Sequence, residues 1–149
     1  GFSKTYAMTG WRLGYAAGPR PIVDQMTKLQ QYSFVCAPSM TQQAGVAALQ
    51  TDMSAYVRHY QQKRDRVIER LAPHYELTPP GGAFYAFPKV SEQLGIGAQA
   101  FVEKAIAEGL LIIPGSVFSE RDTHFRLSYA CDDTTLERGL EILVHLAGG

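Results

Sequence analysis

The sequence predicts an α+β arrangement in which helices pack on one face of a small sheet. Helical spacing of apolar residues dominates the first half, short apolar stretches follow, and a helical pattern closes the chain. The apolar fraction of 46% provides enough side chains for a core. A length of 149 residues suits one domain, or one domain with part of another.

The first third of the chain is predicted to hold a loop, a strand and two helices. We expect the loop at residues 2–7 and a buried strand at residues 11–17, which are mostly apolar and precede a Gly-Pro-Arg-Pro turn. A helix should begin near Pro21, because proline is favoured in a first helical turn. Ser39 or Thr41 should cap the next helix. The apolar face of the first helix is expected to contain Ile22, Met26 and Leu29.

The longest helical pattern covers residues 52–71 and includes a charged run at residues 63–69. Such a run could form a patch for nucleic acid or a solvated helix face. Acidic residues are interleaved with basic ones at spacings typical of salt bridges, which favours the solvated face.

Shorter elements are predicted in the remainder. Strands are expected at residues 75–78, 83–88, 110–113 and 125–130. An amphipathic helix at residues 97–109 lies between the second and third of these strands. Asp132 or Asp133 should cap the last helix.

Charge and cysteine content exclude several classes of function. The 14 basic and 14 acidic residues cancel, so charge gives no reason to expect nucleic acid or an anionic membrane as a partner. No apolar run approaches the length that spans a bilayer. Cys36 and Cys131 are far apart, which predicts reduced thiols in a cytoplasmic protein.

Other motifs give weak signals. Residues 95–100 (GIGAQA) match the spacing of dinucleotide-binding loops, but a good strand does not precede them. The serines lack the context of a hydrolase nucleophile. Because the histidines are scattered, we expect no metal site. The histidines are His59, His74, His124 and His145.

Lys4 and Arg12 form the first candidate site. Lys4 has small and hydroxyl neighbours, and no other charged residue precedes Arg12. A lysine in semi-apolar surroundings can act as an amine nucleophile, and the planar fork of an arginine suits a phosphate. Together they suggest a phosphorylated aldehyde cofactor, although an isolated lysine is more often a solvated surface group.

Arg126 is the second candidate, because it lies between Phe125 and Leu127 in a predicted strand. A charge in this position needs a partner or a cavity. It is either an edge-strand arginine paired with a surface acid or a bidentate clamp on a carboxylate.

Two segments carry a family resemblance. Residues 3–12 (SKTYAMTGWR) resemble the lysine-bearing segment of class I/II aminotransferases of the aspartate aminotransferase superfamily, in particular its prokaryotic-type branch. Residues 125–130 (FRLSYA) resemble the segment whose arginine binds the substrate α-carboxylate. The resemblance runs along the whole chain and implies the α/β PLP-dependent transferase fold, fold type I. By this resemblance, residues 1–50 end the large cofactor-binding domain and residues 51–149 form the small α+β C-terminal domain.

The resemblance also implies roles for individual residues. Lys4 would be the catalytic lysine that forms a Schiff base with pyridoxal 5'-phosphate. Arg12 would bind the cofactor phosphate with help from Ser3, and Arg126 would bind the substrate. The implied activity moves an amino group from an α-amino acid, aspartate or a similar one, to a 2-oxo acid such as 2-oxoglutarate. Family members are usually homodimers.

The resemblance begins at the lysine, so we expect a C-terminal fragment that is inactive alone. Two alternatives remain open at this point. The first is another fold type I enzyme with the same cofactor, such as a carbon–sulfur lyase. The second is a non-catalytic interaction module derived from the small domain.

Overall fold

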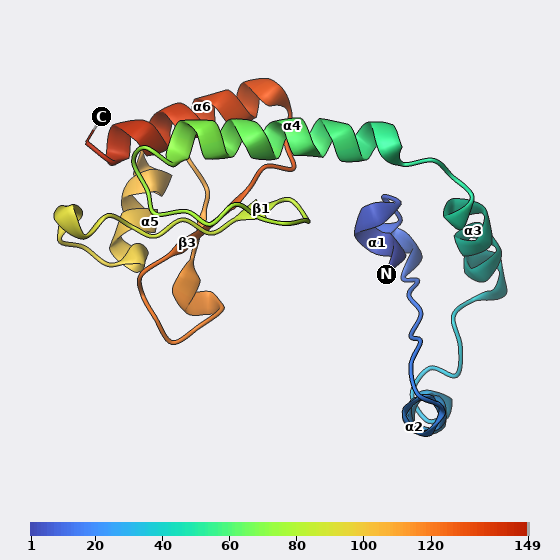
Figure 1. Cartoon of the computed structure of the whole chain (residues 1–149). Helices are drawn as coiled ribbons and strands as arrows, with labels where there is room; N and C mark the ends of the chain where they lie inside the picture. Colours follow the sequence, from blue (N-terminus) through green and yellow to red (C-terminus); the bar gives the residue numbers. More distant parts are fainter. Residues whose placement is uncertain (149) are drawn as a thin grey trace. The chain divides into compact units, whose positions relative to one another are not determined.

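The structure is a computed structural model that describes residues 1–148. The chain divides into two compact units, Gly1–Ala55 and Tyr56–Gly149, which we call unit 1 and unit 2 (Figure 1). Each unit is described by itself below.

Unit 1 consists of short and medium helices around a small core. The helices are α1 (Phe2–Thr5), the 3-10 helix η1 (Thr9–Trp11), α2 (Arg20–Gln31) and α3 (Ser39–Leu49). The core contains Phe2, Met8 and Ala48, with Tyr6, Leu13 and Ala44 packed against it. Gly45 brings α3 close to this core, since a Cβ there would lie 2.5 Å from the side chain of Leu13. The first residues of the chain are therefore held against α3.

The strand expected at residues 11–17 is absent. Residues 9–11 form η1 and residues 13–19 have no regular secondary structure, while Trp11 and Tyr15 are 50% and 71% exposed. A strand needs a neighbour for its backbone hydrogen bonds, and the described part of unit 1 contains no other strand. The prediction of a loop at residues 2–7 is also wrong in part, because α1 occupies most of it.

The two longer helices of unit 1 were predicted in nearly the right places, but their details differ. Pro38 precedes α3 without a side-chain cap, so neither Ser39 nor Thr41 has the expected capping role. The apolar residues expected to face inward from α2 are exposed. They are Ile22, Met26 and Leu29.

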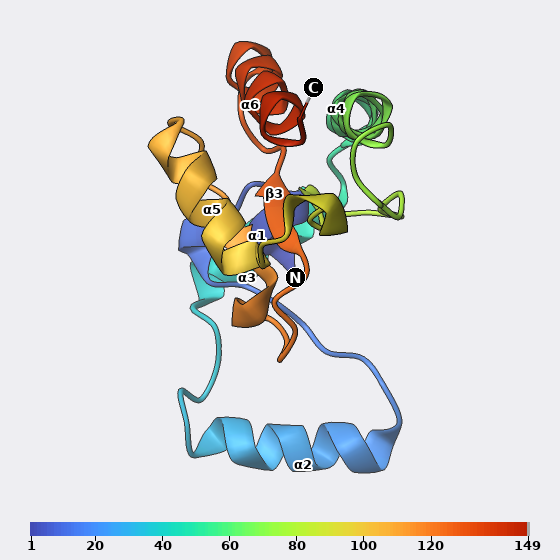
Figure 2. The same cartoon turned by 90° about the vertical axis from the view of Figure 1, so that its left-hand side faces the viewer.

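Unit 2 combines three helices with a small antiparallel sheet. The helices are α4 (Ser54–Leu71), α5 (Ala98–Ala107) and α6 (Asp133–Leu146), with the 3-10 helices η2 (Glu92–Leu94) and η3 (Gly115–Val117). The strands are β1 (Tyr85–Ala86), β2 (Ile113–Pro114) and β3 (Phe125–Ser128), in the order β1-β3-β2. Helices α4 and α6 lie side by side (Figures 1 and 2). The α+β arrangement inferred from the sequence pattern matches this unit.

The core of unit 2 lies between the helices and one face of β3. Phe125 stacks on Phe101 of α5 at a centroid distance of 5.0 Å, and the ring of Tyr75 meets both rings edge-on. The Tyr75 hydroxyl donates a hydrogen bond to the carbonyl of Leu143 at 2.5 Å. Burial raises the pKa of Tyr75 far above its ordinary value, so this hydroxyl remains a donor. Aromatic packing thus joins α5 and β3, and the hydrogen bond of Tyr75 connects this cluster to α6.

Most predicted elements of unit 2 are present. Residues 83–88 and 125–130 contain β1 and β3, residues 97–109 contain α5, and Asp132 caps α6 by accepting a hydrogen bond from the Thr135 N–H. The strand predicted at residues 110–113 begins later and is shorter in the structure, where β2 covers Ile113–Pro114. The strand predicted at residues 75–78 is reduced to an isolated bridge between Glu76 and Lys89.

Lys63 of α4 is buried, with only 6% of its surface exposed. Its amine donates to the backbone carbonyl of Cys131 and pairs with Asp133 at 3.0 Å. The prediction of a solvated charged face is therefore wrong for Lys63, which ties α4 to the segment between β3 and α6. Burial also raises the pKa of the nearby Cys131 thiol. Cys36, in unit 1, is exposed.

Gly115 marks a close approach between η3 and the residue before β3. Its N–H donates to the carbonyl of His124 at 2.6 Å, and a Cβ on Gly115 would lie 2.6 Å from that same oxygen. The opposing atom belongs to the backbone, so it cannot move aside as the end of a side chain can. Only glycine fits here without displacement of η3.

We therefore expect Gly115→Ala to lower the free energy of unfolding by about 1–3 kcal/mol, the usual cost of overpacking. Urea denaturation followed by circular dichroism would measure the loss. Gly81→Ala is the matched control, because a Cβ at Gly81 has no atom within 4 Å. Equal denaturation midpoints for the two variants would contradict this prediction.

Candidate functional site

The candidate residues of unit 1 lie in residues 2–13, which contain α1 and η1 and whose two ends are joined by a backbone hydrogen bond. We call this segment the closed loop. The N–H of Phe2 donates to the carbonyl of Leu13 at 3.2 Å, and both side chains belong to the small core. Lys4 follows Phe2 by two residues, and Arg12 immediately precedes Leu13. The backbone hydrogen bond therefore brings the lysine and arginine segments to the same corner of unit 1.

Polar contacts within the loop connect its two sides. The Thr9 hydroxyl donates to the carbonyl of Ser3 at 2.9 Å. The guanidinium of Arg12 in turn donates to the carbonyl of Thr9 at 3.1 Å. Ser3, Thr9 and Arg12 are thus linked, while Lys4 and Arg12 both remain exposed.

The backbone of this loop is strained at two positions. Ala7 and Arg12 both have a backbone φ of 53°, in the left-handed region that residues other than glycine rarely adopt. Strain of this kind costs on the order of 1–3 kcal/mol per residue and concentrates at binding sites. The conformation of Arg12 turns the chain so that Leu13 returns to Phe2.

The donor groups of the loop fit a phosphorylated aldehyde. They comprise an amine, a guanidinium and hydroxyl groups, and no acidic residue occurs before Asp24. The amine of Lys4 can attack an aldehyde carbon, and Arg12 can donate paired hydrogen bonds to phosphate oxygens. Nearby negative charge that would repel a phosphate is absent from this stretch of sequence.

Arg126 projects from β3 on the face opposite to the core. Phe125 and Leu127 are buried, whereas Arg126 is half-buried and Ser128 is exposed. Because β3 is the central strand, an edge-strand arginine is the wrong interpretation. Within residues 1–148 no acidic side chain pairs with Arg126. Its guanidinium is therefore available for an external anion.

Two aromatic rings flank this guanidinium. Its carbon Cζ lies 4.4 Å from the ring centre of Tyr85 and 4.5 Å from that of Phe118. The sequence did not predict these contacts, because strand order and the position of η3 depend on tertiary structure. The sequence offered only a coarse indication of these contacts. Residues 82–85 and 114–118 resemble turns that approach the substrate in class I/II aminotransferases.

The structure brings Ser3, Lys4 and Arg12 together in unit 1. It places Arg126 in unit 2, beside the rings of Tyr85 and Phe118. The functional roles of all four residues remain predictions.

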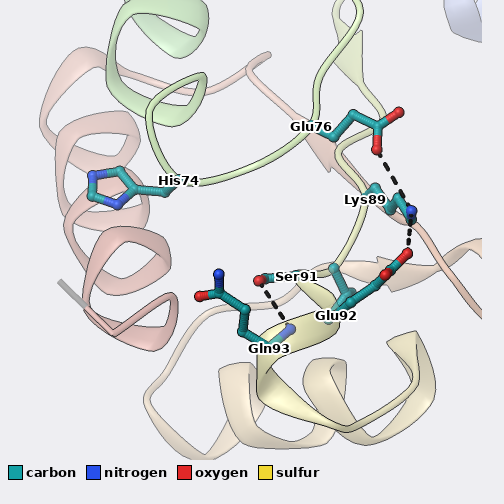
Figure 3. A pocket seen from close by; sticks show the side chains of 7 residues that line it. His74, Glu76, Lys89, Ser91, Glu92 and Gln93 are labelled. Carbon is teal, nitrogen blue, oxygen red and sulfur yellow. Dashed lines mark hydrogen bonds and ion pairs between the residues drawn. The ribbon is translucent and has the colours of Figure 1, made fainter.

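A polar pocket also occurs in unit 2 (Figure 3). Its lining consists of His74, Glu76, Lys89, Val90, Ser91, Glu92 and Gln93. Lys89 pairs with Glu92 at 2.6 Å and with Glu76 at 3.5 Å, and its hydrogen bond holds the pKa of Glu92 below the ordinary value. The charged side chains of this pocket are therefore paired with one another. The described residues contain no cluster of three or more side chains suited to a metal.

The family model described as aminotransferase class I and II matches residues 1–143. A putative aminotransferase of Bacillus subtilis is 39% identical over 98% of this chain and 38% of its own length. A probable aspartate aminotransferase of Methanocaldococcus jannaschii is 39% identical over 96% and 40%. An aromatic-amino-acid aminotransferase of Thermococcus litoralis is 36% identical over 95% and 38%.

Solved structures agree with these matches. The aspartate aminotransferase of Thermotoga maritima superposes with a TM-score of 0.90 at 30% identity, covering all of this chain and 39% of that one. The aromatic aminotransferase of Pyrococcus horikoshii gives a TM-score of 0.89 at 33% identity, covering 99% and 41%.

The fold is therefore that of fold type I PLP-dependent aminotransferases, of the α/β class, as the resemblance implied. The chain belongs to the class I and II aminotransferase family, whose members are enzymes. It spans about 40% of the length of the relatives it matches. Among the residues described, no helix combines the length and apolar character needed to cross a membrane.

Proposed function

We propose that the protein works as a pyridoxal 5'-phosphate-dependent aminotransferase. It would transfer the amino group of an α-amino acid, aspartate or a similar one, to a 2-oxo acid such as 2-oxoglutarate. The observation that carries the proposal is the closed loop of unit 1, which presents an amine and a guanidinium in a stretch without acidic residues. Relatives named for aspartate support the choice of substrate.

Each site residue has a role in this proposal. Lys4 would hold the cofactor covalently, and its amine would take the proton from the substrate Cα as a general base. Arg12 and Ser3 hold the phosphate, and Arg126 holds the α-carboxylate through paired hydrogen bonds. When bound, the cofactor supplies an electron sink that stabilises negative charge at Cα.

The domain assignment is part of the same proposal. Residues 1–50 would end the large cofactor-binding domain, and residues 51–149 would form the small C-terminal domain of a cytoplasmic homodimer. The remaining side chains of the site would come from parts that the relatives have and this chain lacks. The small-molecule partners would be the amino acid and the 2-oxo acid.

Lys4→Ala should remove the visible absorbance of the covalently bound cofactor in the whole protein. It should also lower kcat at least about 100-fold, since a positioned general base contributes 10²–10⁴-fold. Absorbance spectra and initial rates would measure both effects. Lys28→Ala, which changes an exposed lysine of α2, is the control. An intact absorbance band in Lys4→Ala would reject the role of Lys4.

Arg126→Lys should raise KM for the amino acid roughly 10- to 100-fold, because an ammonium cannot reproduce paired hydrogen bonds worth about 1.5–3 kcal/mol. Steady-state kinetics with both substrates would show the change. Arg138→Lys, on the exposed side of α6, provides the control. An unchanged KM would show that Arg126 does not bind the substrate. Release of sulfide and ammonia from a sulfur-containing amino acid, without transfer of its amino group to a 2-oxo acid, would indicate a carbon–sulfur lyase.

The 149-residue chain by itself should show no transamination, because it provides only part of the site. A coupled assay for the 2-oxo acid product, with the whole protein as positive control, would measure this. Turnover by the purified chain would contradict the proposed division of the site.

A further inference from the structure

Arg126 lies in the middle of a row of ring side chains in unit 2. The row consists of Tyr60, Phe84, Tyr85, Phe118, Phe87 and His124. Each of two rings, Tyr85 and Phe118, lies within 4.5 Å of its guanidinium carbon. The two rings make no ring contact with each other among the described residues, although each contacts other rings. The guanidinium carbon therefore lies over both rings, which approach it from different directions.

Both rings are held in place by further aromatic contacts. Tyr85 packs on Phe84 at a centroid distance of 4.6 Å, and Phe84 contacts Tyr60 of α4 at 6.1 Å. On the other side Phe118 meets Phe87 edge-on at 6.5 Å.

The support continues beyond Phe87, which stacks on His124 at 5.1 Å with nearly parallel planes. The close approach at Gly115 sets the position of η3, directly before Phe118. Contacts within unit 2 therefore support both rings, although Phe118 is half exposed.

This arrangement has a consequence for the direction of the N–H groups. An arginine side chain has many rotamers, and part of this conformational freedom is lost whenever a ligand fixes it. Two rings this close to the guanidinium carbon restrict the side chain before any ligand binds, and cation–π attraction favours that position. The N–H groups of a guanidinium lie in its plane, so fixing the plane of Arg126 also fixes the directions in which it donates hydrogen bonds. A planar carboxylate that approaches edge-on matches this geometry.

We propose that Tyr85 and Phe118 are positioning residues that hold the Arg126 guanidinium in the plane in which it receives the carboxylate of the substrate. The inference rests on the proposed function, in which Arg126 binds that carboxylate. Neither ring takes part in the chemical step. Their removal changes the affinity for both substrates, since the amino acid and the 2-oxo acid each carry the same carboxylate.

Kinetics of the whole aminotransferase test the effect on binding. Phe118→Leu and Tyr85→Leu should each raise KM for the amino acid and for the 2-oxo acid about 3- to 10-fold, with kcat changed less than about 2-fold. Phe118→Tyr and Tyr85→Phe keep a ring and should retain the original KM. Tyr56→Leu, an exposed tyrosine of α4 outside the row, is the matched control. Unchanged KM in both leucine variants would overturn the inference.

Nuclear magnetic resonance of the 149-residue chain tests the positioning without any activity. The Nε–H signal of Arg126 should show ring-current shielding and restricted motion. Both should decrease in Phe118→Leu and Tyr85→Leu and persist in Tyr56→Leu, with backbone spectra confirming that each variant is folded. An equally mobile Nε–H in the original chain and in the leucine variants would overturn the inference.

The two tests also separate this inference from the proposed function. If Arg126→Lys leaves KM unchanged, the proposed substrate site is wrong and so is the role of the rings in binding substrate. If Arg126→Lys raises KM while both leucine variants do not, the substrate site stands and only the positioning role is wrong.

Discussion

The alternation of side chains along β3 is the constraint on which the arrangement of unit 2 depends. Phe125 and Leu127 are 0% and 5% exposed and pack into the core, so Arg126 between them must point to the other face. A shift of one residue would expose both apolar side chains and place a charge in the core, which is costly. The apolar core therefore determines where the guanidinium points, and the rings of Tyr85 and Phe118 act on a direction already set.

Local signals were sufficient to predict the longer helices, whereas elements that depend on pairing with distant segments were predicted less well. Proline near the start of α2 and Asp132 before α6 indicated helix ends correctly, because capping acts within a few residues. The apolar run at residues 11–17 has the composition of a strand but no partner in unit 1. In the same way, Lys4 and Arg12 could be recognised from the sequence, whereas the loop that joins their segments depends on a hydrogen bond between Phe2 and Leu13.

In the proposed function the candidate residues would bind groups that all amino-acid substrates share. Relatives named for aspartate and for aromatic amino acids match this chain almost equally, at 39% and 36% identity. This similarity is expected if Lys4 and Arg12 serve the cofactor and Arg126 serves an α-carboxylate, since none of these groups distinguishes one amino acid from another. Selection among substrates then depends on side chains other than these three.

The contrast between the two thiols has a practical consequence. Alkylating reagents react with the thiolate, and the raised pKa of Cys131 reduces its thiolate population near neutral pH, whereas Cys36 is exposed. Under native conditions a reagent therefore modifies Cys36 first, and Cys131 becomes fully reactive only when its surroundings open. The alkylation rate of Cys131 is therefore a built-in reporter of local opening in unit 2, and the exposed Cys36 provides the reference rate of a freely accessible thiol.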